Sequence, residues 1–292
     1  MKRLWLLAAL LSSSALAQQQ DFSKVEIKAT HVAGSVWMLQ GSGGNIAVSV
    51  GEDGIVMVDD QFAPLLPKIK AALAKISQQP VRFVINTHWH FDHVGGNAGL
   101  ADTAAIVAHE NARKRMQTGG KVLDFTMEPL ESRGLPMLTF QQGVSLWLNG
   151  EPVRALHVQP GHTDGDTVVL FTRSNVVHMG DDFVTYGFPV FDYRSGGSVR
   201  GMIGAIDELL PQIPADAKII PGHGPLSTVA DLKKFRGRLD EIVALVSRGL
   251  KSGKSVEQMQ KEKLLAPYED WNGGFIKADQ YIAMVAGDLQ RK

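Results

Sequence analysis

Apolar and polar positions in the first half of the chain alternate between strand-like and helix-like spacing. Residues 44–60, GNIAVSVGEDGIVMVDD, predict two β-branched strands joined by a turn at Glu52-Asp53-Gly54. Residues 63–76 place leucine, isoleucine and alanine on one face of a helix, with lysines elsewhere. The pattern then predicts a strand at 81–87, a helix at about 96–101, a strand at 104–109 and a helix at 110–116. This alternation indicates the α/β class.

The second half of the chain is first rich in strands and then helical. Strand-like runs occupy residues 144–150, 153–159, 166–172, 175–181 and 217–224, with a helical run at 198–213. The C-terminal part, 229–292, has helical spacing at 229–253, 255–263 and 278–292. No stretch resembles a linker or a low-complexity tract, so we expect one domain of two β-rich halves with helices outside both.

The first 17 residues have the organisation of a signal peptide. Lys2 and Arg3 precede the apolar run 4–11, and Ala15-Leu16-Ala17 has the small-x-small form of a cleavage site. A disordered apolar N-terminus is the alternative. We expect removal of residues 1–17, a mature domain over 18–292 that begins at Gln18, and a periplasmic location.

Composition narrows the possible partners. The chain holds 30 basic and 30 acidic residues, which gives no electrostatic reason to expect nucleic acid. The N-terminal apolar run is too short to span a bilayer well, so no stable membrane association is expected after cleavage. There is no cysteine, and metal ligands must therefore be nitrogen or oxygen, unless a methionine takes part. A small-molecule substrate is expected, and the oligomeric state stays open.

Candidate chemistry is concentrated in NTHWHFDHVGGN, residues 86–97, directly after a predicted strand. His88 and His90 are two residues apart, which in extended backbone points both imidazoles to the same side, as a shared metal requires. Asp92 and His93 follow, where we expect the strand to give way to a loop. An H-x-H-x-D-H pattern after an apolar strand is strong evidence for a metal site.

Three later strand ends each deliver one further potential ligand beside a small residue. They are His162 in VQPGHTDGDTVV, Asp181 in VVHMGDD and His223 in IIPGHGP. Together with the first cluster they supply seven nitrogen or oxygen ligands, which is sufficient for two divalent ions.

The order of H-x-H-x-D-H, G-H-T-x-G, G-D and G-H resembles that of the metallo-β-lactamase-fold superfamily over about residues 30–226. The resemblance implies an αββα sandwich, with two mixed sheets flanked by helices and a dinuclear metal site at one edge. It assigns one metal to His88, His90 and His162 and the other to Asp92, His93 and His223, with Asp181 bridging the two.

The same resemblance implies a mechanism and a cofactor. Two Zn²⁺ ions per chain, with iron or manganese as alternatives, would hold a water, lower its pKa and present hydroxide to a substrate carbonyl. Asp92 would be the catalytic residue that orients this water and moves a proton. Asp59, in IVMVDD, matches an aspartate that orients a ligand histidine.

The superfamily includes many chemistries, so the substrate stays open. The commonest β-lactamases carry a cysteine where this chain has Asp181, and a lysine where it has Val184. The preferred interpretation is an exported zinc hydrolase of a β-lactam amide or a lactone. The alternatives are a thioester hydrolase resembling glyoxalase II, an iron oxidoreductase resembling persulfide dioxygenases, and a metal-binding protein without catalysis.

The C-terminal stretch YEDWNGGFIKADQYI resembles the tails of exported superfamily members and specifies no activity.

The remaining histidines are not expected to be ligands. His31, His109 and His157 are interpreted as structural or surface residues, and His178 as a core or supporting residue.

Overall fold

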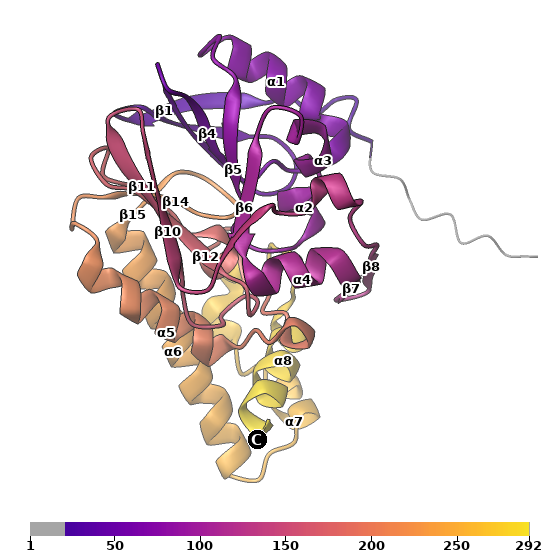
Figure 1. Ribbon diagram of the computed structural model, residues 1–292. Coiled ribbons are helices and arrows are strands. Elements are labelled where there is room, and N and C mark those ends of the chain that lie inside the picture. Colours follow the sequence, from indigo (N-terminus) through magenta and orange to yellow (C-terminus); the bar gives the residue numbers. More distant parts are fainter. Residues whose placement is uncertain (1–20, 292) are drawn as a thin grey trace, which may run out of the picture.

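The computed structural model describes residues 21–291 and contains two large mixed sheets flanked by helices (Figure 1). The expected α/β sandwich is confirmed. The signal peptide predicted over residues 1–17 lies outside the described residues. Within residues 21–291, no helix is long and apolar enough to cross a membrane.

The N-terminal half forms a seven-stranded sheet in the order β1-β2-β3-β4-β5-β6-β9. Neighbours from β1 to β4 are antiparallel, whereas β4, β5, β6 and β9 run parallel. The strands are β1 (Lys28–Ala33), β2 (Val36–Gln40), β3 (Ile46–Gly51), β4 (Gly54–Val58), β5 (Val81–Ile85), β6 (Ala105–His109) and β9 (Leu138–Phe140).

The second half forms a six-stranded sheet in the order β10-β11-β12-β13-β14-β15, antiparallel except for the parallel pair β13–β14. Its strands are β10 (Gly143–Leu148), β11 (Glu151–His157), β12 (Thr167–Phe171), β13 (Val176–His178), β14 (Lys218–Ile220) and β15 (Ser227–Thr228). A separate small hairpin joins β7 (Gly120–Val122) to β8 (Phe125–Met127).

The helices lie on the outer faces of the two sheets, with α1 on the first and α5, α6 and α8 on the second (Figure 1). The C-terminal helices extend from the lower end of the second half in this view. The bounds are α1 (Leu66–Ala74), α2 (Phe91–Val94), α3 (Asn97–Leu100), α4 (Glu110–Thr118), α5 (Val199–Leu209), α6 (Val229–Lys251), α7 (Val256–Lys261) and α8 (Ala278–Gln290).

The core between the sheets is built from the apolar side chains that the strand patterns predicted. Val58 and Ile85 from the first sheet share one buried cluster with Val169, Phe171 and Ile220 from the second. Removing this apolar area from water is the main force that holds the layers together. It also fixes the relative position of the loops that leave the strand ends.

Local structure around the first histidine cluster differs from the sequence prediction in two ways. The strand predicted to reach residue 87 ends at Ile85, so the histidines lie beyond it. Asp92 and His93 do not lie in a loop: they belong to the one-turn helix α2. A single turn is too short to produce a helical pattern of apolar residues, which is why the sequence did not reveal it. Strands β1 and β2 were also not predicted.

Candidate metal centre

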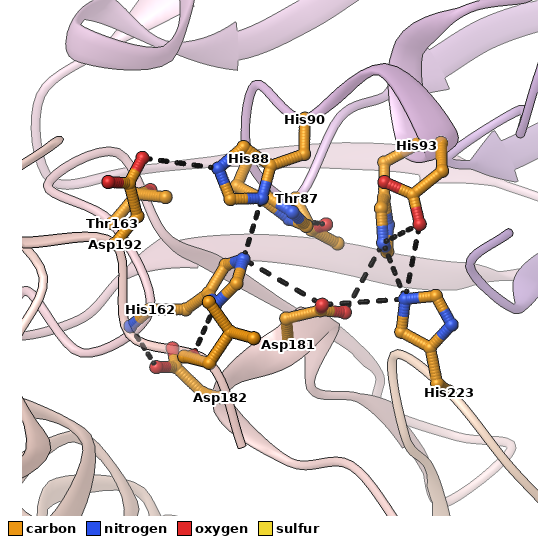
Figure 2. A network of polar contacts seen from close by, with 12 residues as sticks. Thr87, His88, His90, His93, His162, Thr163, Asp181, Asp182, Asp192 and His223 are labelled. Atoms are coloured by element: carbon orange, nitrogen blue, oxygen red, sulfur yellow. Dashed lines mark hydrogen bonds and ion pairs between the residues drawn. The ribbon is translucent and has the colours of Figure 1, made fainter. Parts of the chain in front are cut away.

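All seven candidate ligands come together at one edge of the sandwich, on segments that follow strands of both sheets. Figure 2 labels six of them, with Asp181 between the histidines. Three overlapping groups have donor atoms within 4.8 Å of one another. The groups are His88, His90 and His162; His88, His93 and Asp181; and Asp92, His93 and His223. The chain segments that carry them lie far apart in sequence, so the two-layer fold is what gathers them.

The three-histidine group is buried and its nitrogens converge. His162 Nδ1 donates to the Val190 carbonyl at 2.7 Å, which leaves Nε2 with a lone pair. His90 Nε2 lies 3.4 Å from an Asp192 carboxylate oxygen, to which it can only donate. His90 Nδ1 and His162 Nε2 lie 2.8 Å apart. In the neutral ring that donates from Nε2, His90 Nδ1 offers its lone pair to a metal.

His88 completes the group with an unpaired nitrogen. The Thr87 hydroxyl donates to Asp59 at 2.7 Å, so it accepts from His88 Nδ1 at 3.0 Å. His88 Nε2 is then an acceptor, and it is buried without a hydrogen-bond partner among the described residues. Burial lowers the pKa of His88 well below its ordinary value and that of His162 to about 4, which keeps both rings neutral at neutral pH. Neutral imidazoles with free lone pairs are the form that binds a divalent metal.

The second group lies closer to solvent. His93 Nε2 is 3.2 Å from His223 Nε2, and Asp92 Oδ2 is 3.4 Å from His223 Nε2 and 3.8 Å from His93 Nε2. The Asp92 and His223 side chains are 23% and 19% exposed, whereas that of His162 is 3% exposed. The centre is therefore more exposed to solvent on the Asp92–His223 side.

Asp181 lies between the two groups (Figure 2). Its Oδ1 is 3.2 Å from His93 Nε2, and its Oδ2 is 3.4 Å from His223 Nε2. Burial opposes ionisation of Asp181, but the neighbouring histidines His223 and His93 outweigh it and hold the pKa well below its ordinary value. Gly222 makes the position possible, because a Cβ there would lie 2.0 Å from Asp181 Oδ1. An ionised carboxylate between two sets of imidazoles has the chemistry of a bridging ligand.

Asp59 supports two of the ligands, as the resemblance implied for this residue. One carboxylate oxygen accepts from His93 Nδ1 at 2.7 Å and from the Thr87 hydroxyl, which in turn contacts His88. Orienting both rings through their Nδ1 atoms leaves their Nε2 atoms directed at the centre. Gly44 also approaches His93 so closely that a Cβ would overlap the ring.

Asp192 supports His90 and was not recognised in the sequence. Besides its contact with His90, its Oδ2 accepts from the Ser195 hydroxyl, which accepts from Trp89 Nε1 at 3.1 Å. Its Oδ1 accepts from the backbone amides of Arg194 and Ser195. No spacing in FPVFDYRSGG sets this aspartate apart from a turn residue, so only the folded structure reveals it.

Tyr186 borders the centre next to His223. The two rings are 5.6 Å apart in an edge-to-face arrangement. Burial raises the pKa of Tyr186 well above its ordinary value, and the charges of Asp181 and Asp92 add to this effect. The hydroxyl therefore stays protonated at neutral pH.

An apolar cavity of about 340 Å³ adjoins the ligand-bearing segment. Trp89 and Phe91 alternate with the ligands and form one wall, and Phe125 and Met127 of the small hairpin form another. Phe91 is 37% exposed and lies at the start of α2, beside Asp92. The centre thus has apolar surface next to its polar ligands.

The other histidines have structural contacts. His178 is buried and bonds the Asn45 carbonyl and the Gly180 amide. His109 and His157 stack on one another and bond backbone carbonyls, and His31 lies exposed on β1. These environments agree with their interpretation as core, structural or surface residues.

Comparison with known proteins places the geometry in a family context. Residues 30–243 match the sequence profile of the metallo-beta-lactamase superfamily. A hydroxyacylglutathione hydrolase of Synechococcus sp. (strain JA-3-3Ab) is 26% identical over 233 residues, which cover 76% of this chain and 81% of the relative. A metallo-beta-lactamase type 2 of Bacteroides fragilis is 22% identical over 142 residues, covering 48% and 52%. The crystal structure of DIM-1 metallo-beta-lactamase superposes with a TM-score of 0.62 at 16% identity, covering 75% of this chain and 99% of the other.

Proposed function

The chain belongs to the metallo-beta-lactamase superfamily of metal-dependent hydrolases, and from this premise we propose that it is an exported dizinc hydrolase of cyclic or activated carbonyl compounds. Its substrates would be β-lactam amides or lactones. The observation that carries the proposal is the convergence of seven donor atoms, among which His88 Nε2 is buried and has no hydrogen-bond partner within residues 21–291.

The residues present fit two divalent cations. His88, His90 and His162 would hold one cation through neutral imidazoles, and Asp92, His93 and His223 would hold the other, with Asp181 shared between them. When bound, such a pair supplies a nucleophilic water of lowered pKa and polarises a carbonyl oxygen. The nitrogen and oxygen donors suit zinc, and iron or manganese could use the same set.

Asp92 would orient the attacking water. Its pKa falls to about 2, because His93 and the bond to His223 outweigh the burial that opposes ionisation. A carboxylate of this pKa is ionised at neutral pH and accepts a hydrogen bond well, but it is a weak base. The low pKa therefore favours an orienting role for Asp92 over that of a proton carrier.

Tyr186 would bind the substrate oxygen or its leaving group. The hydroxyl is a protonated donor, and the Tyr186 ring lies edge-to-face with that of His223. A preorganised hydrogen-bond donor does not have to reorient during the reaction. It would therefore stabilise negative charge that develops on a substrate oxygen.

A second candidate is hydrolysis of a thioester. The similarity to a hydroxyacylglutathione hydrolase over 76% of the chain favours it. The same nucleophile and ligands would serve a thioester carbonyl. The export proposed from residues 1–17 weighs against it, because the thiol that forms this substrate is chiefly cytoplasmic.

Metal analysis and a hydrolysis panel test the proposal on protein isolated from the periplasm. We expect about two zinc ions per chain, and hydrolysis of lactones or of a penicillin, cephalosporin or carbapenem that a chelator abolishes. Turnover of a hydroxyacylglutathione alone would favour the second candidate. Iron as the isolated metal would favour an oxidoreductase, and bound metal with no turnover on the whole panel would leave a binding protein.

A further inference from the structure

The segment from Trp271 to Ile276, which lies beyond the family match, packs against the loop that follows Asp181. The Phe188 amide donates to the Trp271 carbonyl at 3.3 Å, and Phe188 pairs with Ile276 in an antiparallel bridge. The Trp271 ring packs edge-to-face on Phe188 and lies 5.3 Å from the Arg238 guanidinium. The tail is therefore attached to the segment that carries Tyr186.

The segment is internally ordered as well. Lys277 Nζ donates to the carbonyls of Asn272 and Gly274 at 2.8 and 3.1 Å, and the Ala278 amide donates to Asn272 Oδ1 at 2.8 Å. These bonds close the loop before α8 begins. The orientation of Phe275 is thus set by a structured loop.

Gly274 brings this loop directly onto Tyr186. A Cβ at Gly274 would lie 2.8 Å from Tyr186 Cδ2 and 3.0 Å from its carbonyl oxygen, so only glycine permits the contact without a shift. The Phe275 ring then meets the Tyr186 ring edge-to-face at 6.0 Å, and Tyr186 meets His223. A continuous row of rings leads from the tail to the second metal group.

Phe275 is 75% exposed although it is held in this row. The row borders the Asp92–His223 side, which is the exposed side of the centre. We infer that Phe275 and Tyr186 form the substrate-binding wall on this side, and that Phe275 contacts an apolar substituent of the substrate. The inference rests on the proposed hydrolase function and assigns the tail a role in selecting substrates with an alkyl or aryl group.

Two matched substrate pairs test the wall: γ-butyrolactone with γ-decalactone, and 6-aminopenicillanic acid with benzylpenicillin. Each pair shares the reacting ring: the lactones differ by a hexyl chain alone, and the penicillins differ by a phenylacetyl group on the 6-amino nitrogen. Phe275→Ala should lower kcat/KM for the apolar member about threefold to tenfold, mainly through KM, as expected for one aromatic contact. The small member should change less than about twofold. Trp147→Ala is the control: it removes another exposed aromatic side chain, on β10, and should leave kcat/KM unchanged for both members of each pair.

Neighbouring glycines provide a second comparison. Gly274→Ala should displace Tyr186 and remove the preference for the apolar member, whereas Gly273→Ala faces open space and should retain it. The inferred wall would be contradicted if Phe275→Ala lowered kcat/KM equally for both members of a pair. It would also be contradicted if a folded Gly274→Ala variant kept the preference for the apolar member.

Saturation-transfer NMR with sodium decanoate, which is not hydrolysed, reports the contact without turnover. Decanoate methylene protons should receive saturation in the wild type and much less in Phe275→Ala. If no member of either pair is hydrolysed while this NMR difference persists, the proposed hydrolase function is wrong, but the binding role of Phe275 is supported. If hydrolysis occurs but both the substrate preference and the NMR signal are independent of Phe275, the binding role of Phe275 is wrong and the proposed function is not affected.

Discussion

Nδ1 of His90 and Nε2 of His162 lie 2.8 Å apart. The remaining nitrogen of each ring is committed, one to Asp192 and the other to the Val190 carbonyl. A metal ion bound by both facing nitrogens would take their lone pairs in a buried site, where the low local dielectric strengthens such contacts.

Removing the metal should therefore destabilise the protein. A ligand at about 100 times its dissociation constant stabilises the native state by about 2.7 kcal/mol. For a domain of this size, that corresponds to a fall in Tm of about 5–10 °C after chelation. Calorimetry of chelated and zinc-restored protein measures it. Zinc should restore Tm and calcium should not, because imidazoles are poor calcium ligands. Identical melting in all three samples would contradict a metal-dependent site.

Asp192 should position His90 through its carboxylate. Asp192→Asn keeps the Oδ1 acceptor for the Arg194 and Ser195 amides, but it removes the negative charge and replaces Oδ2, which faces His90 and accepts from the Ser195 hydroxyl, by an amide donor. Loss of such a supporting carboxylate typically lowers metal affinity about 10-fold to 100-fold. Competition titration with a chromogenic chelator measures this. Asp102→Asn, at an exposed carboxylate, is the control and should leave affinity unchanged. Equal metal affinity in the two variants would show that Asp192 only stabilises the local turn and does not support His90.

The sequence singled out seven residues that lie together in the structure, because each is a chemically distinctive residue placed just beyond an apolar strand. It did not reveal Asp192 or the contact between the tail and Tyr186. Both depend on loops whose positions follow from the packing of the two sheets, and no local pattern encodes such packing. The short helix α2 was missed for a different reason: one turn leaves no period to detect.

The hydroxyl of Tyr281 should cost stability. It is buried and has no hydrogen-bond partner among residues 21–291, while its ring stacks on Phe188. Tyr281→Phe removes the unpaired group and keeps the ring, so we expect a gain of about 1 kcal/mol in the free energy of unfolding. Tyr268→Phe is the matched control, because its hydroxyl donates to Glu241 at 2.7 Å, and it should lose about 1 kcal/mol. Urea titration measures the free energy of unfolding of both variants. A decrease in Tyr281→Phe would mean that the Tyr281 hydroxyl has a hydrogen-bond partner.

Export should produce a mature chain that begins at Gln18. The cleavage site expected after Ala17 follows the apolar run of residues 4–11. N-terminal sequencing of periplasmic protein checks it. Substituting Ala15 and Ala17 with arginine should block processing and leave a longer chain at the membrane. Soluble cytoplasmic protein that retains Met1 would contradict the prediction.

Asp181 should be the residue on which the second metal depends. Asp181→Asn keeps the size of the side chain but removes the charge between His93 and His223. Metal content should fall from about two ions towards one, because the three histidines of the buried group are untouched, and hydrolysis should fall at least 100-fold when both ions are needed. Asp181→Cys should retain zinc, since a thiolate is a good zinc ligand.

A cysteine at position 181 should nevertheless give little β-lactamase activity. Val184 is 2% exposed and belongs to the core beneath the second sheet, so its side chain offers nothing to a substrate carboxylate. Adding Val184→Lys would bury an ammonium group and should destabilise the fold by several kcal/mol instead of creating an anion site. Elemental analysis, penicillin hydrolysis and urea unfolding of the single and double variants test these expectations together. Two bound ions with unchanged rates in Asp181→Asn would show that this carboxylate is not the bridge.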